Sequence, residues 1–153
     1  MENLIVNQID LNNHSVVQNL LGLLTNLTRD RKLYHDLVFK PQHYFETPNS
    51  RLPNSSGWYI ILEGGMPLYV GAAEDLNKRL NTTNGSIDNF ANKGRASDPV
   101  RNFIKKYNQL GIIANLRVFI IPENKLFALQ LNKLDRGNIE KFISVFRGRF
   151  TFI

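Results

Sequence analysis

The chain has 153 residues, 42% of them hydrophobic and 21% charged, which suits one globular domain with a single core. No apolar run approaches the roughly 20 residues that a membrane-spanning helix needs, and residues 1–10 lack the pattern of a secretory signal. We therefore expect a soluble, cytoplasmic protein that contacts no membrane. The chain has no cysteine, so any metal must be held by oxygen or imidazole ligands.

The formal net charge of +6 fits a polyanionic partner, although the same charge is equally typical of basic proteins that bind no nucleic acid. Basic side chains are concentrated in the second half of the chain. Our candidate contacts to a phosphate backbone are Lys78, Lys93, Arg95, Arg101, Lys105, Arg147 and Arg149. Contacts of this kind release counterions and make binding salt-dependent.

The first part of the chain has apolar side chains at helical spacing. A helix is predicted from Ser15, its candidate N-cap, to about Leu37, with a second turn after Asp30. A proline-containing connection then leads to Gly57. We accordingly divide one compact unit into an N-terminal helical accessory segment, residues 1–53, and a principal domain, residues 54–153.

A β-hairpin is predicted at the start of the principal domain. Its strands, Trp58–Leu62 and Leu68–Val70, are joined by a connection that contains Gly64 and Gly65. A helix follows from about Asp75, and its Leu76 and Leu80 face inward while Arg79 lies at the edge of this apolar stripe.

The remaining elements complete a small layered fold. We predict a long loop at Asn81–Ser97, a helix that begins at Asp98-Pro99, and a strand from Leu116 to Ile120 that ends at Pro122. The closing helical pair has the apolar positions Phe127, Leu131 and Leu134 and, after a break at residues 135–137, Ile139, Phe142, Ile143 and Phe146. The predicted fold is α+β, with a small three-stranded antiparallel sheet flanked by helices and an N-terminal helical extension.

Two tyrosines and an arginine recur at intervals of ten residues, as Tyr59, Tyr69 and Arg79. They belong to Gly57-Trp58-Tyr59, to Tyr69-Val70-Gly71 and to the helix at Asp75–Leu80, and a later helix carries Glu140-Lys141-Phe142-Ile143. In order, spacing and structural context this set resembles the GIY-YIG nuclease family over roughly residues 57–150.

The resemblance implies a metal-dependent endonuclease that hydrolyses phosphodiester bonds in DNA. It implies that Tyr59 is the general base and that Tyr69 orients Tyr59 or the attacking water. The Arg79 fork suits two phosphate oxygens, and the Glu140 carboxylate suits Mg²⁺ or Mn²⁺, which prefer oxygen ligands. Gly57 and Gly71 serve the backbone geometry.

The chain departs from the family pattern at three places. Thr83 stands where many members have a histidine, Ala72 follows the second tripeptide where a lysine is common, and no asparagine follows Phe146. An alternative function is therefore a catalytically weak or inactive scaffold that binds nucleic acid. A protein-interaction module with neither property is a third reading.

The substrate and the assembly stay open at this stage. Duplex DNA is the first candidate partner, with single-stranded DNA and RNA as the others. A homodimer would suit the cutting of both strands at a symmetric site, whereas a monomer would nick one strand at a time.

Overall fold

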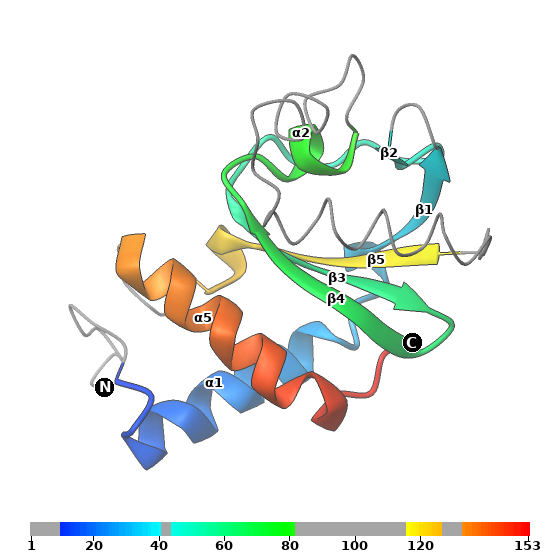
Figure 1. The fold of residues 1–153 in the computed structure, drawn as a ribbon. Coiled ribbons are helices and arrows are strands. Elements are labelled where there is room, and N and C mark those ends of the chain that lie inside the picture. The colour runs from blue at the N-terminus through cyan, green and yellow to red at the C-terminus, as the bar shows by residue number, and fades with distance from the viewer. Residues whose placement is uncertain (1–9, 41–43, 82–115, 127–132) are drawn as a thin grey trace.

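The computed structural model describes residues 10–40, 44–81, 116–126 and 133–153 (Figure 1). Several predicted elements lie outside these ranges: residues 82–97 of the long loop, the helix that begins at Asp98-Pro99, and residues 127–132 of the closing helices. The described residues form an α+β fold in which helices pack on an antiparallel sheet.

The sheet has five strands in the order β2-β1-β5-β3-β4, with antiparallel neighbours throughout. The strands are β1 (Tyr34–Lys40), β2 (Tyr44–Glu46), β3 (Gly57–Glu63), β4 (Met66–Ala73) and β5 (Leu116–Pro122). The three-strand prediction is therefore wrong, whereas the α+β class and the strand that ends at Pro122 are confirmed. Both additional strands come from the N-terminal segment, and β1 pairs directly with β5.

The missed strand β1 follows a helix that is shorter than predicted. α1 (His14–Leu27) is capped by Asn13, whose side chain accepts from the N–H groups of Ser15 and Val16, so the prediction of Ser15 as the N-cap is wrong. The helix ends at Leu27 and not near Leu37. The chain then makes one 3-10 turn (Arg31–Leu33), capped by Asp30, and extends into β1.

The predicted hairpin is confirmed as β3 and β4. Gly64 has a φ of 59°, which a residue with a side chain rarely adopts, and it forms the turn between the strands. The pairing shifts register between Ile61 and Leu62, and both strands extend beyond their predicted bounds. The hairpin places Tyr59 opposite Gly71 and Ile61 opposite Tyr69.

The two faces of the sheet are covered by different helices. On one face, the Trp58 indole donates to the carbonyl oxygen of Arg136 in α5 (Lys133–Phe146), which packs along β4. The other face carries Tyr59 and contacts the short helix α2 (Leu76–Leu80). Figure 1 shows α5 and α2 on opposite sides of the β3–β4 hairpin. β4, against which α5 packs, is an edge strand of the sheet.

The closing helix α5 is continuous where a break was predicted at residues 135–137. Gly137 lies on the exposed side of α5, where a glycine lowers the stability of the helix but does not end it. Asp135 is fully buried. The apolar positions Ile139, Phe142 and Ile143 are buried, as their spacing predicts. In the described ranges, no helix combines the length and the apolar character that crossing a membrane requires.

Candidate active site

The two motif tyrosines lie on the same face of the β3–β4 hairpin. Their ring centroids are 6.1 Å apart, with the ring planes inclined by 37°. Tyr59 retains only 1% of its surface in contact with solvent, whereas Tyr69 is half-buried. Of the two phenols, Tyr69 is therefore the one with more access to water.

Gly71 accommodates the ring of Tyr59. A β-carbon at position 71 would lie 2.8 Å from Cε1 of Tyr59 and closer still to Cζ and Oη. Gly57 is similarly confined, because a β-carbon there would lie 2.9 Å from Cδ1 of Leu76 and closer to the carbonyl oxygen of Ile121. Both motif glycines thus let neighbouring groups pack against the main chain at distances that a β-carbon would prevent.

Arg79 is carried by α2, a helix of five residues that needs tertiary contacts to persist. Its N-cap Asp75 accepts from the Lys78 N–H at 3.0 Å, and this bond is the main reason that the pKa of Asp75 lies below its ordinary value. Leu76 and Leu80 are fully buried. The predicted helix start and inward-facing pair are therefore confirmed, and they fix the position from which Arg79 extends.

The connection between β2 and β3 binds both ends of α2. At the start of the helix, the Leu76 N–H donates to the carbonyl oxygen of Ser55 at 2.9 Å. At the end, Asn81 accepts from the Thr47 N–H at 2.8 Å and donates to Thr47 Oγ1 at 2.8 Å and to Asn77 Oδ1 at 3.1 Å. Thr47 is buried, so these bonds are shielded from water.

Glu140 lies on α5, on the far side of the β4 edge from α2. Its side chain is half-buried, and burial raises the pKa of its carboxyl group. The positive charge of Arg79 partly offsets this rise. Arg79 of α2 and Glu140 of α5 therefore interact electrostatically.

A metal at this site would have one protein ligand among the described residues. No group of three or more His, Asp or Glu side chains converges anywhere in the ranges that the structure describes. The Glu140 carboxylate nevertheless fits a hard cation such as Mg²⁺, which keeps several waters and often binds through one or two carboxylates plus substrate phosphate. Arg79 supplies a fixed positive charge beside the same carboxylate.

Three of the seven predicted nucleic-acid contacts lie in the described part of the chain. Lys78, Arg147 and Arg149 are all exposed. Arg147 Nη1 donates to the carbonyl oxygen of Ser144 at 2.7 Å, and the Arg149 guanidinium lies 5.8 Å from the ring centroid of Phe146. The other four, together with Thr83, lie outside the described residues: Lys93, Arg95, Arg101 and Lys105.

The sequence analysis did not single out the ion pair that holds the start of α5. Arg136 binds the Glu123 carboxylate through Nε to Oε1 and through Nη2 to Oε2, the latter at 3.2 Å. Since Trp58 also binds Arg136, the helix that carries Glu140 is attached to β3 and to the end of β5. Periodicity within one element has no signal for such a contact between elements.

Comparisons of the chain with models of known protein families, with curated proteins and with solved structures find no match. The assignment of a function therefore depends on the chemistry of the site. That site combines two tyrosines on one sheet face with an arginine and a glutamate, from two different helices, that interact electrostatically.

Proposed function

We propose that this chain is a metal-dependent endonuclease that hydrolyses phosphodiester bonds in DNA at the edge of β4. The observation that carries the proposal is the interaction of Arg79 with the half-buried Glu140. The two side chains come from helices on opposite faces of the sheet, yet they act on each other beside the strand that carries Tyr69. A carboxylate, an arginine and a phenol are groups that can hold a cation, stabilise negative charge on phosphate oxygens and act on the attacking water.

Arg79 binds the scissile phosphate in this proposal. Its planar guanidinium presents two parallel donors to two phosphate oxygens and stays charged at every working pH. Anchoring of α2 at both ends by hydrogen bonds supports this role, because a phosphate clamp must be held in position before the substrate arrives.

Glu140 would hold the cation, Mg²⁺ or Mn²⁺. When bound, such an ion supplies positive charge that neutralises the negative charge developing on the phosphate oxygens. Glu140 must be ionised to act as a ligand, and burial makes ionisation harder. The positive charge of Arg79 opposes that effect and favours the ionised carboxylate.

The tyrosines handle the attacking water. Tyr59, ionised to the phenolate, accepts its proton, and Tyr69, the more exposed phenol, orients the water or Tyr59. An ordinary tyrosine has a pKa of about 10, so a phenol that acts near neutral pH needs positive charge nearby.

Lys78, Arg147 and Arg149 are exposed and available to the substrate backbone.

A second candidate function is favoured by the burial of Tyr59. A general base must reach the water that it deprotonates, and Tyr59 retains only 1% exposure. The alternative is a scaffold that binds nucleic acid without cutting it. This alternative predicts salt-sensitive binding and no cleavage with any metal.

The two functions are separated by one panel of reactions. The purified protein is incubated with duplex DNA, single-stranded DNA and RNA, each with Mg²⁺, with Mn²⁺ and with chelator. The nuclease predicts metal-dependent cleavage of the duplex, and substitution Tyr59→Phe or Arg79→Gln slows it about 100-fold or more. Salt-sensitive binding without cleavage in every reaction would establish the alternative, and the absence of both would remove nucleic acid as the partner.

A further inference from the structure

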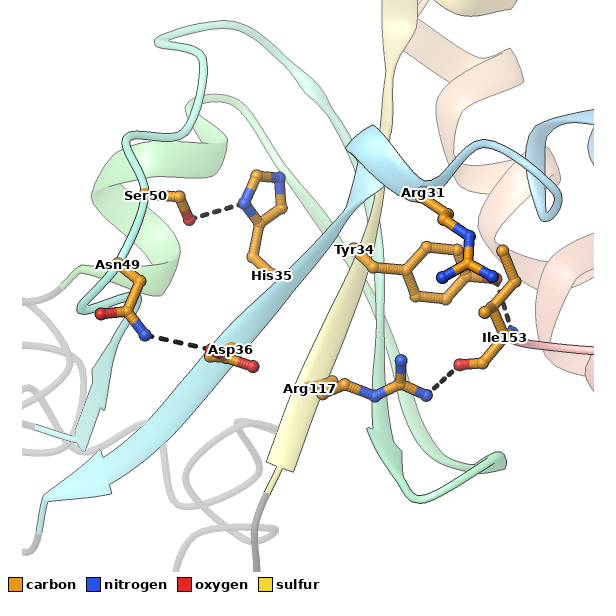
Figure 2. A pocket seen from close by; sticks show the side chains of 8 residues that line it. All are labelled: Arg31, Tyr34, His35, Asp36, Asn49, Ser50, Arg117 and Ile153. Carbon is orange, nitrogen blue, oxygen red and sulfur yellow. Dashed lines mark hydrogen bonds between the residues drawn. The ribbon is translucent and has the colours of Figure 1, made fainter.

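A polar hollow lies at β1, three strands away in the sheet from β4, the strand of the candidate active site. Neighbouring strands are roughly 4.8 Å apart, so about 14 Å of sheet separates the two places. The hollow has a volume of about 330 Å³, at the small end of the range for ligand pockets. Its lining residues are Arg31, Tyr34, His35, Asp36, Asn49, Ser50, Arg117 and Ile153 (Figure 2).

One side of the hollow is cationic. The Arg117 guanidinium lies 5.4 Å from the ring centroid of Tyr34, and its Nη2 donates to the main-chain oxygens of Gly64, at 3.1 Å, and Ile153. Tyr34 is fixed in turn, because its hydroxyl donates to the Thr28 carbonyl oxygen at 2.6 Å and accepts from the Ile153 N–H at 3.2 Å. Arg31 is the other arginine that lines the hollow (Figure 2). Within the described ranges, neither arginine is paired with a side-chain carboxylate.

The other side of the hollow carries a carboxylate. Asp36 is the direct cross-strand partner of Arg117 in the β1–β5 ladder, so the two side chains leave the same face of the sheet. Opposite charges at such positions ordinarily pair. Here Asp36 accepts instead from Asn49 Nδ2 at 3.0 Å, while Arg117 turns toward Gly64 and Ile153. The structure therefore holds an acceptor and a cation apart across the hollow.

The third side is formed by His35 of β1 and the loop that carries Ser50. Ser50 Oγ lies 2.6 Å from His35 Nδ1, and Thr47 Oγ1 donates to the Ser50 carbonyl oxygen at 3.2 Å. Burial lowers the pKa of His35, although the charge of Asp36 acts in the opposite direction. The imidazole is therefore neutral near pH 7, so the positive charge of the hollow comes from the two arginines.

These walls define the chemistry of a ligand. Two guanidinium groups suit a phosphate, which carries up to two negative charges and accepts forked N–H donors. A carboxylate on the opposite side suits N–H donors, such as the exocyclic amino group of a nucleobase. An amino acid would match the signs of the charges, but its single carboxylate is a poorer partner for two arginines.

We propose that this hollow binds a nucleotide whose base carries an amino group, with its phosphate at Arg31 and Arg117 and the amino group at Asp36. The nucleotide is either free or the terminal unit of a strand, since both present the same phosphate and base. This binding does not depend on the cleavage proposed above, because the hollow lies at β1 and β5 and none of its lining residues belongs to the candidate active site.

The test is titration calorimetry of the full chain in chelator, so that no cleavage occurs. The probes are cytidine, guanosine and uridine 5′-monophosphates, ribose 5-phosphate, inorganic phosphate and glycine. We expect the cytidine or the guanosine nucleotide to bind about tenfold more tightly than the uridine nucleotide and ribose 5-phosphate, the factor for one hydrogen bond to a charged group. Oligonucleotides that begin with cytidine, with and without a 5′-phosphate, distinguish a strand end from the free nucleotide.

Two variants and a control locate the binding. Arg31→Gln weakens the binding of every phosphate-bearing probe about tenfold, whereas Asp36→Asn weakens only the binding of nucleotides whose base has an amino group. Arg29→Gln removes a nearby exposed charge that does not line the hollow, and it leaves all affinities within about twofold. Equal affinities for all phosphates, tighter binding of glycine, no binding, or no effect of Arg31→Gln would each overturn the proposal. Circular dichroism confirms that the variants are folded.

Discussion

The contact between Tyr59 and Gly71 makes a quantitative prediction about the hairpin that carries the candidate site. Replacement Gly71→Ala introduces a β-carbon 2.8 Å from Cε1 of Tyr59 and closer to its Cζ and Oη, against the roughly 3.5–4.0 Å of a comfortable carbon contact. Tyr59 is 1% exposed and packed on a central strand, so its ring has little room to move. We expect a loss of about 1–3 kcal/mol in the free energy of unfolding, typical of an overpacked core.

The free energies of unfolding are measured in urea for four proteins: wild type, Gly71→Ala, Tyr59→Leu and the double variant. Leucine lacks the distal ring atoms that the new methyl group would meet, so Gly71→Ala should cost at least about 1 kcal/mol less in that background. Tyr59→Phe gives no such relief, because Cζ remains. Gly22→Ala is the matched control: nothing lies within 4 Å of its new methyl group, and the change should stabilise α1 by about 0.5–1 kcal/mol. If Gly71→Ala lowered the free energy of unfolding equally in the tyrosine and leucine backgrounds, the Tyr59 ring would not be what opposes the new methyl group.

Three further results are expected. Glu140 has a folded-state pKa above its unfolded value, so the stability that it contributes is present at low pH and is lost as pH rises through the folded pKa. In chelator, the Glu140→Gln variant should therefore become more stable relative to wild type as pH rises from about 4 to 8. A stability difference that stays constant over this pH range would contradict the effect of burial on Glu140. Asn81→Ala breaks three hydrogen bonds to Thr47 and Asn77 and should cost about 1–3 kcal/mol in urea unfolding, while Asn26→Ala on the exposed side of α1 costs less than about 0.5. If Arg79 holds phosphate from an anchored helix, Asn81→Ala should also slow any cleavage, whereas an unchanged rate would show that the anchor does not serve the site.

The parts of the fold that depend on neighbouring residues could be predicted from the sequence. The Gly64-Gly65 turn, the helix start near Asp75 and the inward pair Leu76 and Leu80 each depend on contacts within a few residues, and the structure contains all of them. These local signals also identified the hairpin and the helix that carry three of the four candidate catalytic residues.

The five-stranded sheet could not be predicted in the same way. Leu33 and Leu37 are four residues apart, as two inward-facing positions of a helix would be, so a pattern analysis can extend the helix into β1. What makes the segment a strand is pairing with β5, about eighty positions later in the chain, where Tyr34 faces Phe119 and Leu37 faces Leu116. Both leucines are buried in the sheet fold as they would be in a helix, so hydrophobicity alone did not separate the alternatives.

The candidate site was likewise predictable from the sequence only in part. The motif selects Tyr59, Tyr69, Arg79 and Glu140, but spacing says nothing about how deeply each is buried. The near-complete burial of Tyr59 and the half-burial of Glu140 arise from packing across the sheet. The separated Asp36 and Arg117 depend on strand register, which no local pattern in the sequence encodes.

The central claim is that Glu140 anchors a metal for phosphodiester hydrolysis beside Arg79. Its most direct test is the single-turnover rate of duplex DNA cleavage with Mn²⁺ by wild type, Glu140→Gln and the matched variant Lys141→Gln, whose exposed side chain is the next one along α5. The account predicts that Glu140→Gln cleaves about 100-fold more slowly or not at all, while Lys141→Gln keeps the wild-type rate. Cleavage by a folded Glu140→Gln protein at the wild-type rate would contradict it.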